Sequence, residues 1–104
     1  MALTSTRIES GTTTPVFIAT GDQAITTIIF CNTDEGAETS IDVYAVSDGD
    51  VVGASTTILR KLILPPTETF VMDAEKLILG DGDAIWAQAT VNLIVTCTVS
   101  SVSI

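Results

Sequence analysis

The chain has 104 residues, which is enough for one compact domain and too few for two. It carries 13 acidic residues against four basic ones and no histidine, for a formal net charge of −9. We interpret this excess as a solubility feature, and because an acidic surface repels phosphate backbones, nucleic acid is not an expected partner. The apolar stretches are far shorter than the roughly 20 residues that span a bilayer, so no membrane association is expected either.

Composition and turn spacing predict the fold class. Thr, Ile and Val make up more than a third of the residues, and β-branched side chains favour strands over helices. Turn signals recur at intervals of about ten residues, without any long helical pattern. We predict an all-β fold, an antiparallel β-sandwich or jelly roll of about seven to eight strands. Residues 1–14 are assigned to an N-terminal arm or edge strand and residues 15–104 to the β-sandwich domain.

The first half of the chain contains four strand patterns. The earliest covers residues 3–9 and lies close to a chain end, where an edge strand or a free arm is expected. Pro15 opens a second strand, which ends at the turn Gly21-Asp22. Residues 24–33 are apolar on both faces, as in a central strand, whereas residues 39–47 alternate as in a half-buried one.

The second half contains the remaining strands. Residues 56–64 form one that Pro65-Pro66 must end, because consecutive prolines cannot donate to a ladder. A new strand follows at Thr67, and residues 73–76 within it are predicted as a turn or one helical turn. After a turn at residues 80–83, strands are predicted over residues 84–91 and 93–104. In the last of these, a β-bulge at Ser100-Ser101 is expected to shift the inward phase to Val102 and Ile104.

One core, or a core-like interface, is predicted from large apolar residues within these strands. Its expected members are Phe30, Val43, Phe70, Trp86 and Val99. Truncation of Phe70 to Ala is expected to cost about 3–5 kcal/mol if that side chain is fully buried.

The two cysteines, Cys31 and Cys97, lie in strand patterns and are expected to be buried free thiols. A disulfide between them is the alternative if their strands pack face to face. Two thiols without a CxxC spacing and without histidine do not supply the four ligands of a zinc site. No metal or other cofactor is therefore expected.

Residue patterns for catalysis are missing from the sequence. Without histidine, Ser-His-Asp and Cys-His arrangements are excluded, and no glycine-rich loop for phosphates is present. The pairs Asp48/Asp50 and Asp81/Asp83 both read D-G-D, which is typical of tight turns and lacks the ligand series of a calcium loop. The chain is not expected to be an enzyme, and no catalytic, cofactor-binding or metal-binding residue is assigned.

Two aromatic residues leave an alternative open. Trp86 and Tyr44 have the chemistry of a stacking platform for sugars, as in a carbohydrate-binding module or adhesin. A single Trp between Ile85 and Ala87 in a strand is more typical of a core or interface anchor.

Three segments resemble small virion structural proteins of tailed bacteriophages. They are Ile28-Ile29-Phe30-Cys31-Asn32-Thr33, Leu62-Ile63-Leu64-Pro65-Pro66-Thr67-Glu68-Thr69-Phe70 and Glu75-Lys76-Leu77-Ile78-Leu79-Gly80-Asp81-Gly82-Asp83. The resemblance covers roughly the last three quarters of the chain and involves strand and corner residues. It implies a β-sandwich that either decorates and cements a capsid or belongs to the neck, tail or baseplate.

We therefore expect a capsid decoration protein that binds the major capsid protein or other virion proteins, made in the host bacterial cytoplasm. It is expected to self-associate, with a trimer favoured, through sheet edges and chain ends. Deletion of residues 1–9 is expected to leave a folded domain that no longer attaches, and attachment is expected to tolerate salt. The interface candidates are Leu3, Arg7, Ile8, Val102 and Ile104.

Overall fold

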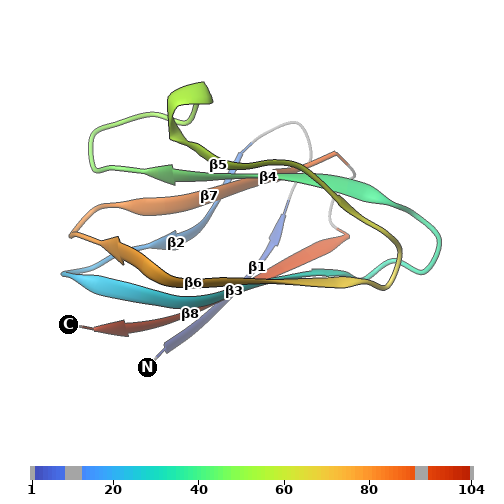
Figure 1. Ribbon diagram of the computed structural model, residues 1–104, viewed down its shortest axis with the longest axis horizontal. Coiled ribbons are helices and arrows are strands. Elements are labelled where there is room, and N and C mark those ends of the chain that lie inside the picture. The colour runs from blue at the N-terminus through green and yellow to red at the C-terminus, as the bar shows by residue number, and fades with distance from the viewer. Residues whose placement is uncertain (1, 9–12, 91–93, 104) are drawn as a thin grey trace.

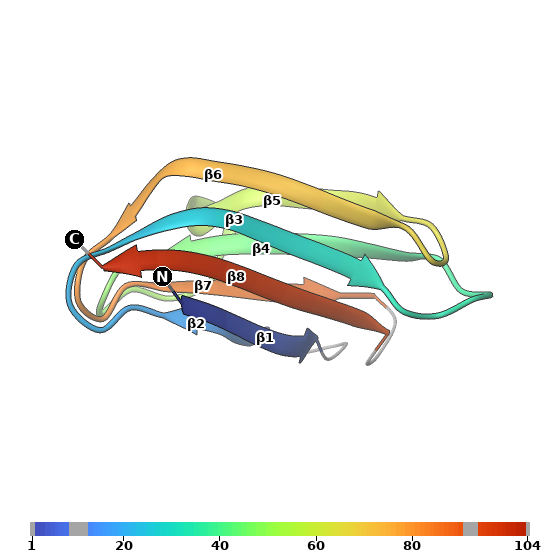
Figure 2. The same ribbon diagram turned by 90° about the horizontal axis from the view of Figure 1, so that it is seen from below.

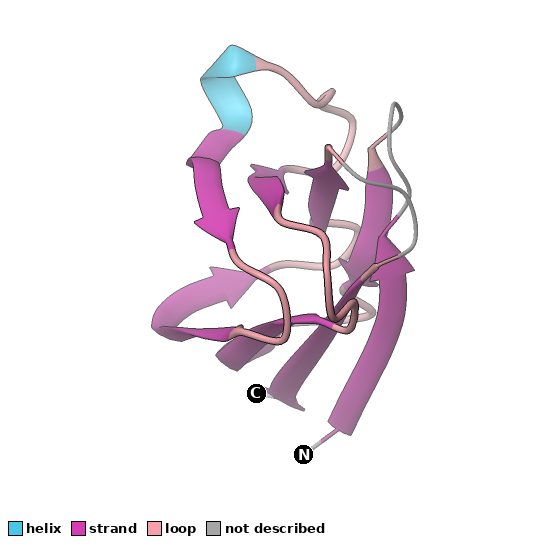
Figure 3. Cartoon of the chain, turned by 90° about the vertical axis from the view of Figure 1, so that its right-hand side faces the viewer, coloured by secondary structure: helices cyan, strands magenta, loops and turns pink. Residues whose placement is uncertain are grey.

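The computed structural model describes residues 2–8, 13–90 and 94–103, and within this part of the chain it forms a two-layered β-sandwich (Figures 1 and 3). A single 3-10 turn, Ala54–Thr56, interrupts the strands. The eight strands are β1 (Ala2–Ile8), β2 (Thr14–Ile18), β3 (Gln23–Asn32), β4 (Thr39–Val46), β5 (Thr57–Leu64), β6 (Thr69–Leu79), β7 (Ala84–Ala89) and β8 (Val95–Ser103). The all-β class and the sandwich predicted from the sequence are confirmed.

The strands form two four-stranded antiparallel sheets. The first sheet has the order β1-β8-β3-β6 and the second the order β2-β7-β4-β5. The pairs β1/β8, β2/β7, β3/β6 and β4/β5 give the pattern of a long hairpin, and the pairs β8/β3 and β7/β4 join these ribbons into sheets. This is the strand order of a jelly roll. Figure 2 shows the first sheet from its outer side.

The core lies between the sheets and is formed by alternating inward residues of both. In β8 the buried residues are every second one from Val95 to Ser101, which is the period of a strand with one solvated face. Phe30 and Cys97, directly opposite each other on β3 and β8, are both fully buried at the centre. The other fully buried large side chains are Ile8, Ile25, Ile28, Ile41, Ile85, Val16, Val43, Val95 and Val99.

Two local predictions were wrong. Residues 73–76 do not form a turn, because β6 runs through them, although the register against β3 shifts there. The bulge expected at Ser100-Ser101 lies instead in β3, where Thr26 is the extra residue between the pairs Ile25/Ser101 and Thr27/Ser100. The Thr26 hydroxyl donates a hydrogen bond to the Ser100 carbonyl oxygen at 3.0 Å. β8 therefore keeps its phase, so that Ser101 is buried and Val102 is on the outer side.

Of the five residues predicted for the core or a core-like interface, three are buried and two are partly exposed. Phe30, Val43 and Val99 are fully buried. Phe70 packs against the core but is only partly buried, because β6 is the edge strand of the first sheet. Trp86 lies outside the core, since Ile85 and Ala87 on either side of it point inward and a strand alternates.

Candidate functional site

The described side chains on the outer face of the first sheet include very few charges. One cross-strand row consists of Ser5, Thr98, Ile29 and Val71, and Ser5 and Thr98 are hydrogen-bonded through their hydroxyl groups at 3.1 Å. A neighbouring row consists of Arg7, Thr96, Cys31 and Thr69. The remaining rows are Leu3, Ser100 and Thr27, and Val102, Ala24 and Ile78. We call these residues the hydroxyl-rich face.

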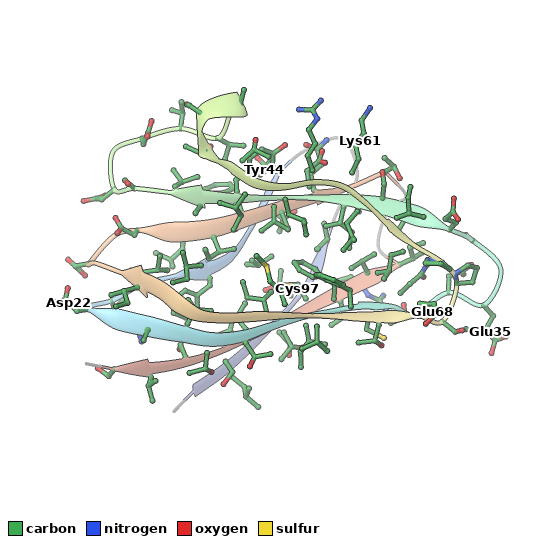
Figure 4. The ribbon with its side chains drawn as sticks, in the orientation of Figure 1. Asp22, Glu35, Tyr44, Lys61, Glu68 and Cys97 are labelled. Atoms are coloured by element: carbon green, nitrogen blue, oxygen red, sulfur yellow. The ribbon has the colours of Figure 1, made fainter. Side chains whose placement is uncertain are left out.

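Most acidic residues lie instead at the two ends of the sandwich. Asp22 is at one end, and Glu35 and Glu68 are at the other (Figure 4). The end with Asp22 also holds the D-G-D turns, and we call it the aspartate end; its members are Asp22, Asp48, Asp50, Asp81 and Asp83. Among the described side chains of the hydroxyl-rich face, Arg7 is the one charged residue.

The predicted interface residues occupy different environments. Leu3 and Arg7 are exposed on the hydroxyl-rich face, and Val102 is partly exposed there. Ile8 points the other way and is fully buried, so its assignment to an interface is corrected: it belongs to the core. Ile104 lies outside the described residues. Because Ile8 completes the core and β1 pairs along β8, deletion of residues 1–9 should destabilise the fold, contrary to the sequence-based expectation.

The outer face of the second sheet brings the two aromatic candidates together. Tyr44 and Trp86 are directly opposite each other on β4 and β7, and Pro15 and Thr57 complete their row on the edge strands. Both aromatic side chains are partly exposed. This adjacency could not be predicted from the sequence, because Tyr44 and Trp86 are 42 positions apart and only the β4/β7 register aligns them.

A hollow of about 430 Å³ adjoins Trp86 on this side of the sandwich. It lies between β2, β7 and the loop that connects β4 to the 3-10 turn. The residues that line it are Thr13, Ile18, Val46, Ser47, Gly49, Asp50, Val51, Val52, Gly82, Ala84 and Trp86. Local sequence patterns did not indicate this hollow, because Ile18 faces outward only through the shift in the β2/β7 register between Pro15 and Phe17.

In the second D-G-D motif, the side chains of Asp81 and Asp83 accept backbone hydrogen bonds that hold the turns. Asp83 accepts hydrogen bonds from the backbone N–H of Asp48 at 2.8 Å and of Gly80 at 2.9 Å, so it joins the β4–β5 loop to the β6–β7 turn. These bonds, from Asp48 first and then Gly80, hold the pKa of Asp83 below its ordinary value of 3.8. Asp81 accepts a bond from Gly21 N at 2.8 Å. The turn interpretation of these residues is in keeping with this geometry.

The Asp83 bonds predict a specific pH dependence. Because the folded-state pKa is lowered, their contribution to stability is complete above the unfolded-state value and is lost as pH falls through the folded-state value. We expect Asp83→Ala to lower the melting temperature at about pH 6, with the deficit against wild type shrinking toward about pH 2. Thermal melts across this range test it. Asp22→Ala, at the same end, corrects for the change in net charge, and a deficit independent of pH would contradict the prediction.

Both cysteines are free thiols, as predicted, but in different environments. Cys97 faces the core, and burial raises its pKa to about 12. Cys31 is only partly buried, because it lies on the hydroxyl-rich face. The two side chains are on opposite faces of neighbouring strands, since Phe30 and not Cys31 is opposite Cys97, and this arrangement excludes a disulfide between them.

The thiols should therefore differ in reactivity. Iodoacetamide at about pH 8 should label Cys31 in the native protein and leave Cys97 unmodified, because only a thiolate that solvent reaches is alkylated. Denaturant should make both react. Peptide mass spectrometry identifies the labelled residue, and equal native labelling of both would contradict the assigned faces.

Within the described residues, no group of three or more His, Cys, Asp or Glu side chains is placed to hold a metal ion. The same part of the chain contains no helix with the length and apolar character needed to cross a bilayer. Comparisons with protein-family models, with curated proteins and with solved structures find no match to this chain.

Proposed function

We propose that this chain is a non-enzymatic structural protein of a tailed-bacteriophage virion, and that it decorates the capsid by binding the major capsid protein through the hydroxyl-rich face. The observation that carries the proposal is the scarcity of charge among the described side chains of this face. In a chain with a net charge of −9, Arg7 is the one charged residue among the described side chains of this broad, four-stranded face. A protein surface can approach this face without the cost of burying unpaired carboxylates.

The face also has the composition of a contact surface. Val71 and Ile78 on β6 and Leu3 on β1 are large apolar residues that are more than half exposed. Exposed apolar residues that share one face mark interaction sites more often than scattered ones do. The Ser and Thr hydroxyl groups between them supply donors and acceptors, so the contact need not be purely apolar.

The resemblance to small virion proteins is the reason for proposing a bacteriophage particle as the site of action. The three segments similar to small virion proteins cover parts of β3, β5 and β6, which are scaffold strands. A jelly roll is a fold of viral capsid proteins and of lectins alike, so the fold by itself favours neither.

Copy number separates capsid decoration from a place in the neck, tail or baseplate. In purified virions, a decoration protein should approach the abundance of the major capsid protein, because it repeats over the shell. Quantitative mass spectrometry measures this ratio. A ratio corresponding to a few dozen copies would instead assign the chain to the neck, tail or baseplate, and its complete absence from virions would refute the proposal.

A matched pair of variants tests the face. Val71 and Ile63 are 57% and 56% exposed but lie on opposite outer faces. Val71→Asp should abolish occupancy of shells that lack the protein, since it places a charge in the contact, whereas Ile63→Asp should leave occupancy unchanged. Wild-type attachment should persist in 1 M salt, where the Debye length is about 3 Å. Equal occupancy of both variants would rule out this face.

Self-association is a separate part of the proposal. We expect copies to assemble, with a trimer favoured, around local symmetry axes of the shell. Light scattering of the free protein at high concentration, with and without shells, measures this. A monomer that neither assembles nor binds shells would contradict it.

A carbohydrate-binding module is the second candidate, and one observation favours it: the register sets Tyr44 directly opposite Trp86 on an outer face. Aromatic rings on a sandwich surface are suited to stacking on sugar rings. A glycan array tests this function, and an array without signal from any sugar class would remove it.

A further inference from the structure

The hollow beside Trp86 is a shaped apolar pocket. Six of the residues that line it are apolar: Ile18, Val46, Val51, Val52, Ala84 and Trp86. Val46 and Ala84 are buried, whereas Ile18 and Val51 are 57% and 73% exposed. A volume of about 430 Å³ lies within the range of pockets that bind small ligands or single large side chains.

The loop that forms one wall is held in place without a ligand. Its start is bound to the β6–β7 turn, because Asp48 N donates to Asp83 Oδ1 at 2.8 Å. Its end is closed by the Thr56 hydroxyl, which accepts from Gly53 N at 2.9 Å. Gly82 lets the two segments approach closely: its φ is +87°, and a Cβ there would meet Asp48 Cγ at 2.5 Å. The pocket is therefore preorganised, which lowers the cost of binding.

The surroundings of the pocket are acidic. Asp50 is one of the lining residues, and among the described residues no Lys or Arg lines the pocket. The pocket opens at the aspartate end, beside the turns that contain Asp48, Asp81 and Asp83. An occupant with positive charge next to its apolar part would meet a complementary potential here, whereas an acidic occupant would be repelled.

We infer that this pocket receives an apolar side chain from an extended segment of a partner protein, with Lys or Arg flanking that side chain. This deepens the proposed function and rests on it, since the partner would be another virion protein. The lining favours a protein segment over a sugar. Apart from Trp86, the described lining residues with hydrogen-bonding side chains are only Thr13, Ser47 and Asp50. Sugar sites need several convergent polar groups beside the aromatic ring.

The free protein allows a direct test. Trp86 is the only tryptophan, so its fluorescence reports on the pocket without a label. The probe is a blocked hexapeptide, Lys-Lys-Phe-Leu-Lys-Lys, compared with Glu-Glu-Phe-Leu-Glu-Glu and Lys-Lys-Ser-Gly-Lys-Lys. We expect the first peptide to shift the Trp86 emission and the amide resonances of Val46, Val52 and Gly82. Each comparison peptide, which lacks one half of the chemistry, should bind at least about tenfold more weakly.

Matched variants locate the site. Ile18→Ser and Val51→Ser should each weaken binding of the first peptide by about tenfold, the effect of losing one buried aliphatic contact. Ile63→Ser, at 56% exposure on the same outer face but outside the pocket, should not change it. Asp50→Asn should weaken binding at low salt only, whereas Glu35→Gln at the far end should have no effect.

Each other outcome overturns the inference. Equal binding of all three peptides, or equal losses in Ile18→Ser and Ile63→Ser, would show that the pocket does not select this chemistry. An emission shift caused by oligosaccharides and by none of the peptides would make the pocket a sugar site. If Ile18→Ser no longer binds the first peptide but still occupies shells fully, the pocket is not used in attachment. The copy number in virions still tests the proposed function independently.

Discussion

Phe30→Ala is expected to lower the free energy of unfolding by about 3–5 kcal/mol, among the largest effects of any single truncation in this chain. Phe30 is fully buried on β3, an inner strand of the first sheet, and lies opposite Cys97. Neighbouring strands hold it on both sides, so the cavity left by truncation cannot close by a shift of an edge. Because a domain of this size is stable by only about 5–15 kcal/mol, the variant should melt far below the wild type. Urea denaturation followed by Trp86 fluorescence measures the loss.

Phe70→Ala is the matched control for this prediction. Phe70 is paired with Phe30 across β3 and β6 but is only partly buried on an edge strand. Its truncation should cost about 1–2 kcal/mol, less than the sequence-based expectation for a fully buried side chain. Equal losses in the two variants would mean that the first sheet does not end at β6 in solution, for example because another copy covers it.

Asn32→Ala is expected to cost about 2–4 kcal/mol, although Asn32 has no apolar side chain to lose. Asn32 is 1% exposed at the end of β3. Its amide nitrogen lies within hydrogen-bond distance of the carbonyl oxygens of Ala37 at 2.8 Å, Leu64 at 3.1 Å and Pro65 at 3.1 Å. Its side-chain oxygen accepts from Asp34 N at 3.0 Å. One side chain thus ties the β3–β4 loop to the end of β5, and truncation leaves these backbone groups without their partner.

Asn32→Asp separates hydrogen bonding from shape, because it keeps the size and the acceptor but replaces the donating amide. A carboxylate there would face the three carbonyl oxygens in a buried site, so its folded-state pKa should be raised above the usual value of about 3.9. The destabilisation should therefore be small at low pH and grow as pH rises above about 4, where the unfolded chain ionises first. Denaturation at several pH values, with Asn32→Ala as the pH-independent reference, tests this. A constant loss for Asn32→Asp would contradict the role assigned to the amide.

Local patterns were sufficient for what depends on local chemistry. The alternation of Ile41 and Val43 with polar neighbours, the run at residues 24–33 and the break at Pro65-Pro66 each predicted an element close to the observed β4, β3 and β5. Side-chain period and missing backbone donors act within a few residues, so no knowledge of partner strands is needed to interpret them. The missing residue types also limited the chemistry of the chain from the sequence alone, because histidine-based catalysis needs histidine.

Which side of a sheet each residue faces, and which residues lie next to each other, depended on the tertiary structure. Which strand accommodates an extra residue depends on both partners, so the bulge at Thr26 in β3 was misplaced in β8 from the sequence. Whether an apolar residue lies in the core or on an outer face depends on the register, and a shift of one residue reverses it. For this reason Ile8 was assigned to an interface, although it is buried in the core. The pairing of Tyr44 with Trp86, the hydroxyl-rich face of the first sheet and the pocket beside Trp86 all join residues from several strands. The sequence by itself thus determined the strands and the limits on catalytic chemistry, whereas only the jelly-roll pairing decided which residues meet at a surface. The reason is that contacts between strands distant in the chain are set by register and not by local preference.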